Sequence, residues 1–189
     1  MRKNALLLVL ALLLFAAPVA SAEGEAPKTR TETITLEGMP EEITTTYFES
    51  ARGYSFWYDA ESIKPQAWDG EEGEGGDVDT FVPADPNAAA VRLDIYFGGA
   101  IDYTLDQAVQ DTLDSLTLNY GDAGVQSETP FEGYEARMCY ADDGKTSIEY
   151  FLVAVEGGIY HIVLTCPVEA GEGFGARIWQ MLKSFQVTQ

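Results

Sequence analysis

Apolar and polar residues alternate in several short stretches of the chain, which is typical of strands with one buried face. The pattern is strongest near the C-terminus, where it covers residues 134–140, 147–155 and 159–165. The turn residues Asp143-Gly144 and Gly157-Gly158 separate these stretches, so we expect a three-stranded meander. After Tyr150 the middle stretch has apolar residues at both odd and even positions, and therefore on both faces of a strand. This predicts a central strand that is covered on both faces.

The first half of the chain contains four further stretches of this kind, at residues 31–36, 42–48, 54–58 and 90–97. A turn at Gly38 should join the first two in a hairpin. In the third stretch, Trp57 lies on the face opposite Tyr54, Phe56 and Tyr58. In the fourth, the parity predicts inward side chains at Val91, Leu93, Ile95 and Phe97. Residues 59–86 show no regular pattern, and we expect a surface excursion there.

Two segments have the period of amphipathic helices. Thr104 and Gln107 form a capping-box pattern at the start of the first helix, over 104–118, with an apolar stripe at Leu105, Val109, Leu113 and Leu116. The second runs from about Glu169 to Lys183, with Phe174, Ile178, Met181 and Phe185 as its apolar positions. The fold class is therefore α+β, a mostly antiparallel sheet of about six strands with helices packed on its faces.

The N-terminus has the three parts of a secretory signal peptide. Arg2 and Lys3 precede an apolar run, and Ala20-Ser21-Ala22 gives a small-residue cleavage site. We expect a signal peptide at 1–22, a flexible leader at 23–30 and a single domain at 31–189. The protein would then be secreted or held in the cell envelope, with no integral membrane segment after cleavage.

The charge of the chain narrows the choice of partners. The formal net charge is −20, and removal of Arg2 and Lys3 with the signal peptide makes it −22. Such a chain repels nucleic acid and anionic membrane surfaces, so we expect neither as a partner. Basic partners, cationic ligands and divalent metals remain compatible with it. The plainer interpretation is that the charge keeps an exported protein dispersed.

The chain has two cysteines, Cys139 and Cys166, and export would bring them into an oxidising compartment. The meander argues against a disulfide, because the turns place both cysteines opposite residues 148–150 of the middle strand. Two strand spacings put their Cα atoms about 10 Å apart, and a disulfide needs less than about 7 Å. Two buried thiols are the prediction, although a bulge or register slip would allow the bond.

Metal binding is the most specific chemistry that the sequence suggests. An acidic, glycine-rich loop at 69–79 supplies oxygen ligands of the kind Ca²⁺ prefers, namely Asp69, Glu71, Glu72, Glu74, Asp77 and Asp79. The spacing does not follow the EF-hand pattern, and a solvated loop is the simpler interpretation. Melting with Ca²⁺ against melting with a chelator would decide between the two.

No catalytic constellation stands out. His161 is the only histidine and lies in the middle of a predicted strand, and both cysteines lie in or beside strands, where thiols are inert. Acidic residues are so abundant that no pair of carboxylates is distinguished. Trp57 and Trp68 are the residues that we expect to form a ligand surface, if one exists.

The chain resembles the PsbP/Mog-like superfamily. The likeness lies in Gly53-Tyr54-Ser55-Phe56-Trp57-Tyr58, in Gly133-Tyr134-Glu135-Ala136-Arg137, in the strand at 159–164 and in Met181-Leu182-Lys183-Ser184-Phe185. The resemblance implies an α/β/α sandwich, and a bacterial exported member with a role in binding and no catalytic residues or cofactor. The acidic loop after Trp68 departs from the family pattern.

Together these features predict an exported, non-catalytic binding or accessory domain for an unknown protein or small ligand. One alternative is a cell-envelope hydrolase that uses carboxylates, which requires two acids converging in a cleft and at least one raised pKa. The other is a structural protein stabilised by Ca²⁺.

Overall fold

The computed structural model describes residues 26–36, 38–66, 77–88, 90–98 and 103–188 of the chain. The expected signal peptide, Trp68 and the acidic positions from Asp69 to Glu74 lie outside the described residues.

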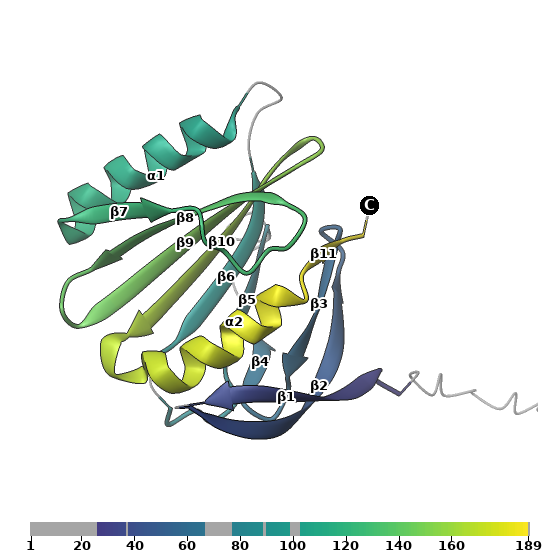
Figure 1. Cartoon of the computed structure of the whole chain (residues 1–189). Coiled ribbons are helices and arrows are strands. Elements are labelled where there is room, and N and C mark those ends of the chain that lie inside the picture. The colour runs from purple at the N-terminus through teal and green to yellow at the C-terminus, as the bar shows by residue number, and fades with distance from the viewer. Residues whose placement is uncertain (1–25, 37, 67–76, 89, 99–102, 189) are drawn as a thin grey trace, which may run out of the picture.

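The described strands form two antiparallel sheets (Figure 1). The larger has the order β4-β5-β6-β10-β9-β8-β7, and its strands are β4 Ile63–Gln66, β5 Val78–Pro83, β6 Arg92–Gly98, β7 Ala123–Gln126, β8 Glu135–Asp142, β9 Thr146–Val155 and β10 Gly158–Pro167. The smaller has the order β1-β2-β3-β11, and its strands are β1 Thr29–Leu36, β2 Met39–Ser50, β3 Tyr54–Asp59 and β11 Gln186–Val187.

Two α-helices lie on opposite faces of the larger sheet. Helix α1 (Leu105–Tyr120) packs against β7, β8 and β9, and α2 (Ala176–Lys183) lies on the other face beside the smaller sheet (Figure 1). The capping box is confirmed, because Thr104 Oγ1 accepts from the Gln107 N–H and the Gln107 side chain accepts from the Thr104 N–H. Helix α2 is shorter than expected, since a 3₁₀ turn at Val168–Ala170 and a π turn at Gly171–Gly175 precede it.

Strand β9 is the centre of the structure, as its pattern predicts. Ile148 and Leu152 belong to the core that α1 covers. Phe151 and Val153 point to the other face, into the larger core that includes Phe56 of the smaller sheet and residues of α2. Strands β8 and β10 pair with β9 along its length, so every side of this strand is covered by protein.

The expectation of about six strands is wrong in detail, because the described chain has eleven. Strands β4 and β5 lie in the region expected to be irregular, and β7 and β11 lie outside every predicted strand. Each is only two to six residues long, and so short a segment shows too few alternations to be recognised. Phe97 lies on the expected face, with its ring 5.0 Å from that of Tyr160, but it is 43% exposed because it lies next to the end of β6.

The two cysteines are free and buried, as predicted. Cys139 lies opposite Tyr150 and Cys166 opposite Ser147, so they flank β9 from β8 and β10. They also belong to the two separate cores. Burial raises the pKa of Cys139 to about 11 and raises that of Cys166 as well, where the Glu149 carboxylate adds to the effect.

The central position of β9 predicts the cost of a cavity there. Leu152 is fully buried, and Leu152→Ala should lower the free energy of unfolding by about 2–5 kcal/mol. Urea unfolding measures this. Leu118→Ala is the matched control, because Leu118 is 85% exposed on α1 and its loss should cost less than about 0.5 kcal/mol. Equal losses in the two variants would contradict the central role of β9.

Candidate functional site

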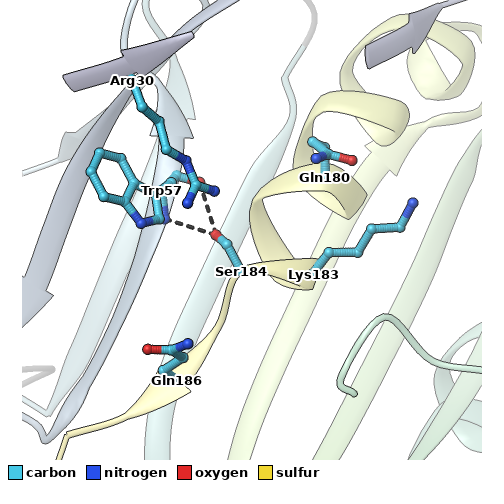
Figure 2. A pocket seen from close by; sticks show the side chains of 6 residues that line it. All are labelled: Arg30, Trp57, Gln180, Lys183, Ser184 and Gln186. Atoms are coloured by element: carbon cyan, nitrogen blue, oxygen red, sulfur yellow. Dashed lines mark hydrogen bonds between the residues drawn. The ribbon is translucent and has the colours of Figure 1, made fainter. Parts of the chain in front are cut away.

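Trp57 lines a notch of about 260 Å³ where the smaller sheet meets the end of α2. Arg30 comes from β1, Trp57 from β3 and Gln186 from β11, while Gln180, Lys183 and Ser184 come from α2 and its C-terminal end. Figure 2 shows these side chains arranged around the notch. Residues distant in sequence therefore form one recess.

Two cationic side chains flank a pair of aromatic rings on the outer face of the smaller sheet. Trp57 lies on this face because its parity is opposite to that of Phe56, as predicted. The Arg30 guanidinium is 4.4 Å from the centre of the Trp57 ring, and the Tyr47 ring lies 5.3 Å from that of Trp57. Lys28 in turn lies 5.3 Å from the Tyr47 ring. Such cation–π contacts stabilise a cation at the surface by about 0.5–1 kcal/mol.

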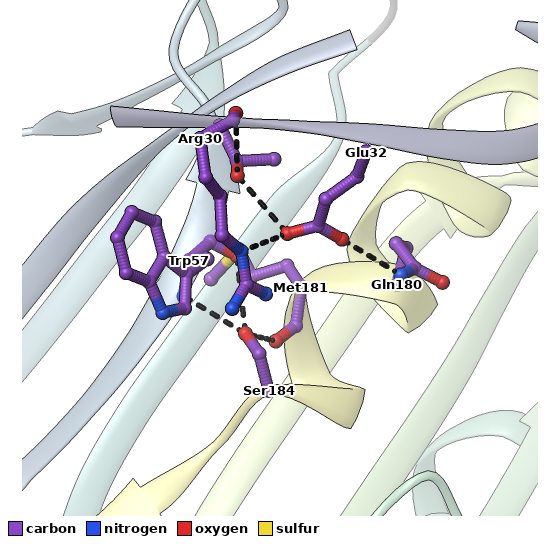
Figure 3. A network of polar contacts seen from close by, with 7 residues as sticks. Arg30, Glu32, Trp57, Gln180, Met181 and Ser184 are labelled. Atoms are coloured by element: carbon purple, nitrogen blue, oxygen red, sulfur yellow. Dashed lines mark hydrogen bonds and ion pairs between the residues drawn. The ribbon is translucent and has the colours of Figure 1, made fainter. Parts of the chain in front are cut away.

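Ser184 fixes the floor of the notch by joining α2 to β3. Its Oγ accepts from the Trp57 N–H at 2.8 Å and donates to the Met181 carbonyl at 2.7 Å (Figure 3). The Trp57 carbonyl lies 3.3 Å from the same oxygen. The end of the helix is thereby held against the strand that carries Trp57.

Glu32 orients the cation above Trp57. One carboxylate oxygen accepts from Arg30 Nε at 2.5 Å and from Thr45 Oγ1 at 3.0 Å, and the other accepts from Gln180 Nε2 at 3.0 Å (Figure 3). Burial alone would raise the pKa of Glu32, but the hydrogen bonds from Gln180, Arg30 and Thr45 outweigh it and lower the pKa. The carboxylate is therefore ionised at neutral pH and holds the guanidinium in place.

The notch has positive charge in a strongly acidic chain. Arg30 and Lys183 line it, and the Glu32 carboxylate pairs with Arg30. Lys183 lies in the last turn of α2, where the helix dipole favours a cation. The indole ring, the amide groups of Gln180 and Gln186 and a surplus cation suit a small anionic group, and a carboxylate fits this donor set.

The other residues considered from the sequence lie elsewhere. Trp68 is outside the described residues, so the proposed pairing of Trp57 with Trp68 stays a prediction. Of the six calcium candidates, Asp77 and Asp79 are described, and both face Arg52, at 3.6 and 3.4 Å. Asp79 also accepts from Ser50 and Tyr54, each at 2.5 Å. The described residues contain no cluster of three or more potential metal-ligating side chains.

His161 lies in a cluster of aromatic side chains. Its ring stacks on Tyr96 with centroids 4.9 Å apart, and its Nδ1 lies 3.1 Å from the hydroxyl of Tyr150, which also contacts the Tyr96 hydroxyl. Burial lowers the pKa of His161. The histidine is thus part of the packing between β6, β9 and β10.

A second recess, of about 180 Å³, contains two carboxylates. Asp142 and Glu149 line it together with Cys166 and with Gly171 and Gly175 of the π turn. Burial raises the pKa of Glu149, although the Trp179 Nε1–H, which donates to it at 2.8 Å, acts in the opposite direction. Sequence reasoning did not identify this pair.

Sequence reasoning did not identify Arg30 or Lys183 as site residues. Arg30 falls in the segment expected to be a flexible leader, yet it belongs to β1. The only available signal was the alternation of residues 31–36, which extends to Thr29 in the structure. Arg30 directly precedes the predicted strand, and nothing in the sequence places it over Trp57.

Comparison with family models gives no match, and neither does comparison with curated proteins. Solved structures do match. One is cyanobacterial PsbP from Synechocystis sp. PCC 6803, at 14% identity and a TM-score of 0.49, over 90% of this chain and 99% of that one. Another is the Ran-binding protein Mog1p from Saccharomyces cerevisiae, at 17% identity and a TM-score of 0.38, over 86% and 97%.

A third match is a protein from Bacteroides thetaiotaomicron, at 15% identity and a TM-score of 0.47, over 76% of this chain. The chain spans about half of that protein, 48% of its length. PsbP and Mog1p, the two proteins after which the PsbP/Mog-like superfamily is called, are thus among the solved structures to which this chain is similar, and at these identities and TM-scores no ligand, partner or role follows from the matches. None of the described helices is both long and apolar enough to cross a membrane.

The network around Glu32 predicts a pH dependence of stability. The pKa of Glu32 is lower in the folded protein than in the unfolded chain. The ionised carboxylate therefore contributes its full stabilisation of the fold above the unfolded pKa of about 4.3, and this stabilisation is lost as the pH falls through the folded pKa. Glu32→Gln should therefore be less stable than wild type at pH 7, and the difference should shrink towards pH 3. Urea unfolding between these pH values measures it. Glu42→Gln, at an exposed position of β2, is the control, and a pH-independent difference for Glu32→Gln would contradict the assignment.

Proposed function

We propose that the chain is an exported, non-catalytic binding domain that docks a protein partner through the Trp57 notch. The observation that carries this proposal is the cation pair of Arg30 and Lys183 beside an indole ring, held in place by Glu32 and Ser184. Fixed cations next to an aromatic ring are typical of contacts that orient one protein on another.

The size of the notch favours a protein partner. Its volume of about 260 Å³ is below the range of about 300–1,000 Å³ that holds whole small molecules. One carboxylate side chain, or the C-terminal carboxylate of a polypeptide, matches both the volume and the charge.

The net charge indicates what the rest of the partner carries. A chain with a formal net charge of −20 attracts positively charged proteins and speeds their association. The partner is therefore a basic protein with a carboxylate at the centre of its docking surface. The acidic surface drives encounter, and the notch sets the orientation.

Lys183→Glu tests the role of the notch. Reversing this charge should weaken binding of the partner at least about tenfold, because its carboxylate would face another carboxylate. The partner is first recovered from the host envelope with wild-type protein, and its affinity is then measured by calorimetry. Lys145→Glu is the matched control, since it changes the net charge equally but lies in the exposed β8–β9 turn.

The two variants separate the notch from the overall field. Loss of affinity in Lys183→Glu with wild-type affinity in Lys145→Glu supports the proposal. Equal losses would assign binding to net charge alone and would contradict a docking notch. A partner that wild type binds and both variants bind equally well would also contradict it.

A carboxylate-based hydrolase is the second candidate, favoured by the recess that holds Asp142 and Glu149. The raised pKa of Glu149 suits a general acid, and Asp142 is the second carboxylate of the same recess. Its volume of about 180 Å³ admits only a small group, which is why binding is the preferred proposal.

An activity screen tests this candidate. Wild-type protein would cleave cell-wall glycans or chromogenic glycosides, and Glu149→Gln would lower the rate at least about a hundredfold. Glu156→Gln, in the exposed β9–β10 turn, would keep the wild-type rate. The absence of cleavage by wild-type protein, or full activity in Glu149→Gln, would remove the candidate.

A further inference from the structure

The larger sheet has one face that is only half covered. Helix α1 packs on β7, β8 and β9, and among the described elements it leaves β4, β5 and β6 uncovered on that side (Figure 1). The register places Lys64 opposite Val82, and Arg92 opposite Thr165. Thr165 lies opposite Ile148, which α1 covers, so Arg92 and Thr165 lie on the α1 side of the sheet.

A groove of about 680 Å³ lies on this uncovered half. Its volume falls within the range of about 300–1,000 Å³ that is typical of small-molecule sites. The β5–β6 connection forms one wall, and most of the lining is apolar, contributed by Val82, Pro83, Pro86, Ala88, Ala90 and Val91. The two prolines restrict the backbone of that wall, so the groove is preformed.

Two cations border the apolar lining. Arg92 donates to Asp94 at 2.6 Å and to Thr80 at 3.2 Å, so its charge is partly matched. Lys64 donates to the neutral carbonyl of Ala84 at 3.3 Å and forms no ion pair with any described residue. Asp85 also lines the groove, but its carboxylate accepts from the backbone and side chain of Asn87. Lys64 therefore provides a cation for a ligand.

The edge of the sheet argues against a peptide as the occupant. Strand β4 is at the end of the sheet order, where an added strand would pair. Pro65 lies within this four-residue strand and has no N–H to donate, which protects the edge against strand addition. The groove itself, and not the strand edge, is thus the part that can hold a ligand.

We propose that this groove binds a single-chain amphiphile with an anionic head, such as a fatty acid. The aliphatic chain lies along Val82 and the prolines, and the head group lies at Lys64. This site is on the α1 side of the larger sheet, while α2 and the Trp57 notch belong to the other side, so the inference does not depend on the proposed docking function.

Calorimetric titration of the full domain with three probes tests the site. Dodecanoate should bind, and dodecanol should bind more weakly because it has no charge. The affinity of dodecyl phosphate relative to that of dodecanoate distinguishes a phospholipid-like head group from the carboxylate of a free fatty acid. Lys64→Met should weaken dodecanoate about fivefold or more and leave dodecanol within about twofold. Lys145→Met, in the exposed β8–β9 turn, should change neither.

A second variant locates the apolar part. Val82→Trp fills the groove from the sheet face and should weaken all three probes at least about tenfold, with circular dichroism and melting to check that it folds. If Val82→Trp does not fold, the Lys64→Met comparison decides. Wild-type protein that binds no probe at about 1 mM overturns the proposal. So does equal dodecanoate binding in wild type and Lys64→Met, or undiminished binding in folded Val82→Trp.

Discussion

The burial of β9 on both faces is the constraint on which the rest of the structure depends. Leu152 and Phe151 are adjacent in the chain, and each is fully buried in a different core. One core needs α1 as its cover, and the other needs α2 together with the smaller sheet. Because an apolar strand of this kind cannot be left exposed on either side, the layers follow from its sequence. The notch and the groove consequently lie at the margins of these covers.

Cations are scarce in this chain, and their positions are therefore informative. Two of them hold elements together: Arg177 of α2 bonds Asp59 of β3 at 2.5 Å and Glu41 of β2 at 2.7 Å, and Arg52 faces Asp79. Arg30 and Lys183 line the notch, while Lys64 and Arg92 line the groove. In a chain of formal net charge −20, a cation that borders a recess opposes the negative electrostatic potential of the rest of the surface at that point. Recesses bordered by cations are therefore the places where this chain can recognise an anionic group.

Sequence reasoning was sound where a pattern repeated over many residues. The meander, the two-faced β9, the capping box at Thr104 and the separation of Cys139 from Cys166 all follow from periodicity and turn chemistry. Strands β4 and β11 could not be predicted, since two to four residues carry no period and are ordered by their neighbours. Only part of the notch could be predicted. The strand pattern places Trp57 on the face opposite Phe56, but the stacking of Arg30 on its ring depends on how β1 pairs with β2. The contact between Trp57 and Ser184 joins residues 127 positions apart in the sequence.

The Trp57 notch and the groove at Lys64 lie on opposite sides of the larger sheet, and this arrangement determines whether binding at one could affect the other. Packed cores separate them, and close-packed interiors deform little unless they contain an element with two discrete arrangements. No described strand or helix lines both the notch and the groove. An amphiphile in the groove would therefore leave Arg30 and Lys183 in place, and a partner at the notch would not close the groove. If both proposals hold, this arrangement suits independent binding of the amphiphile and the partner better than a switch in which one controls the other.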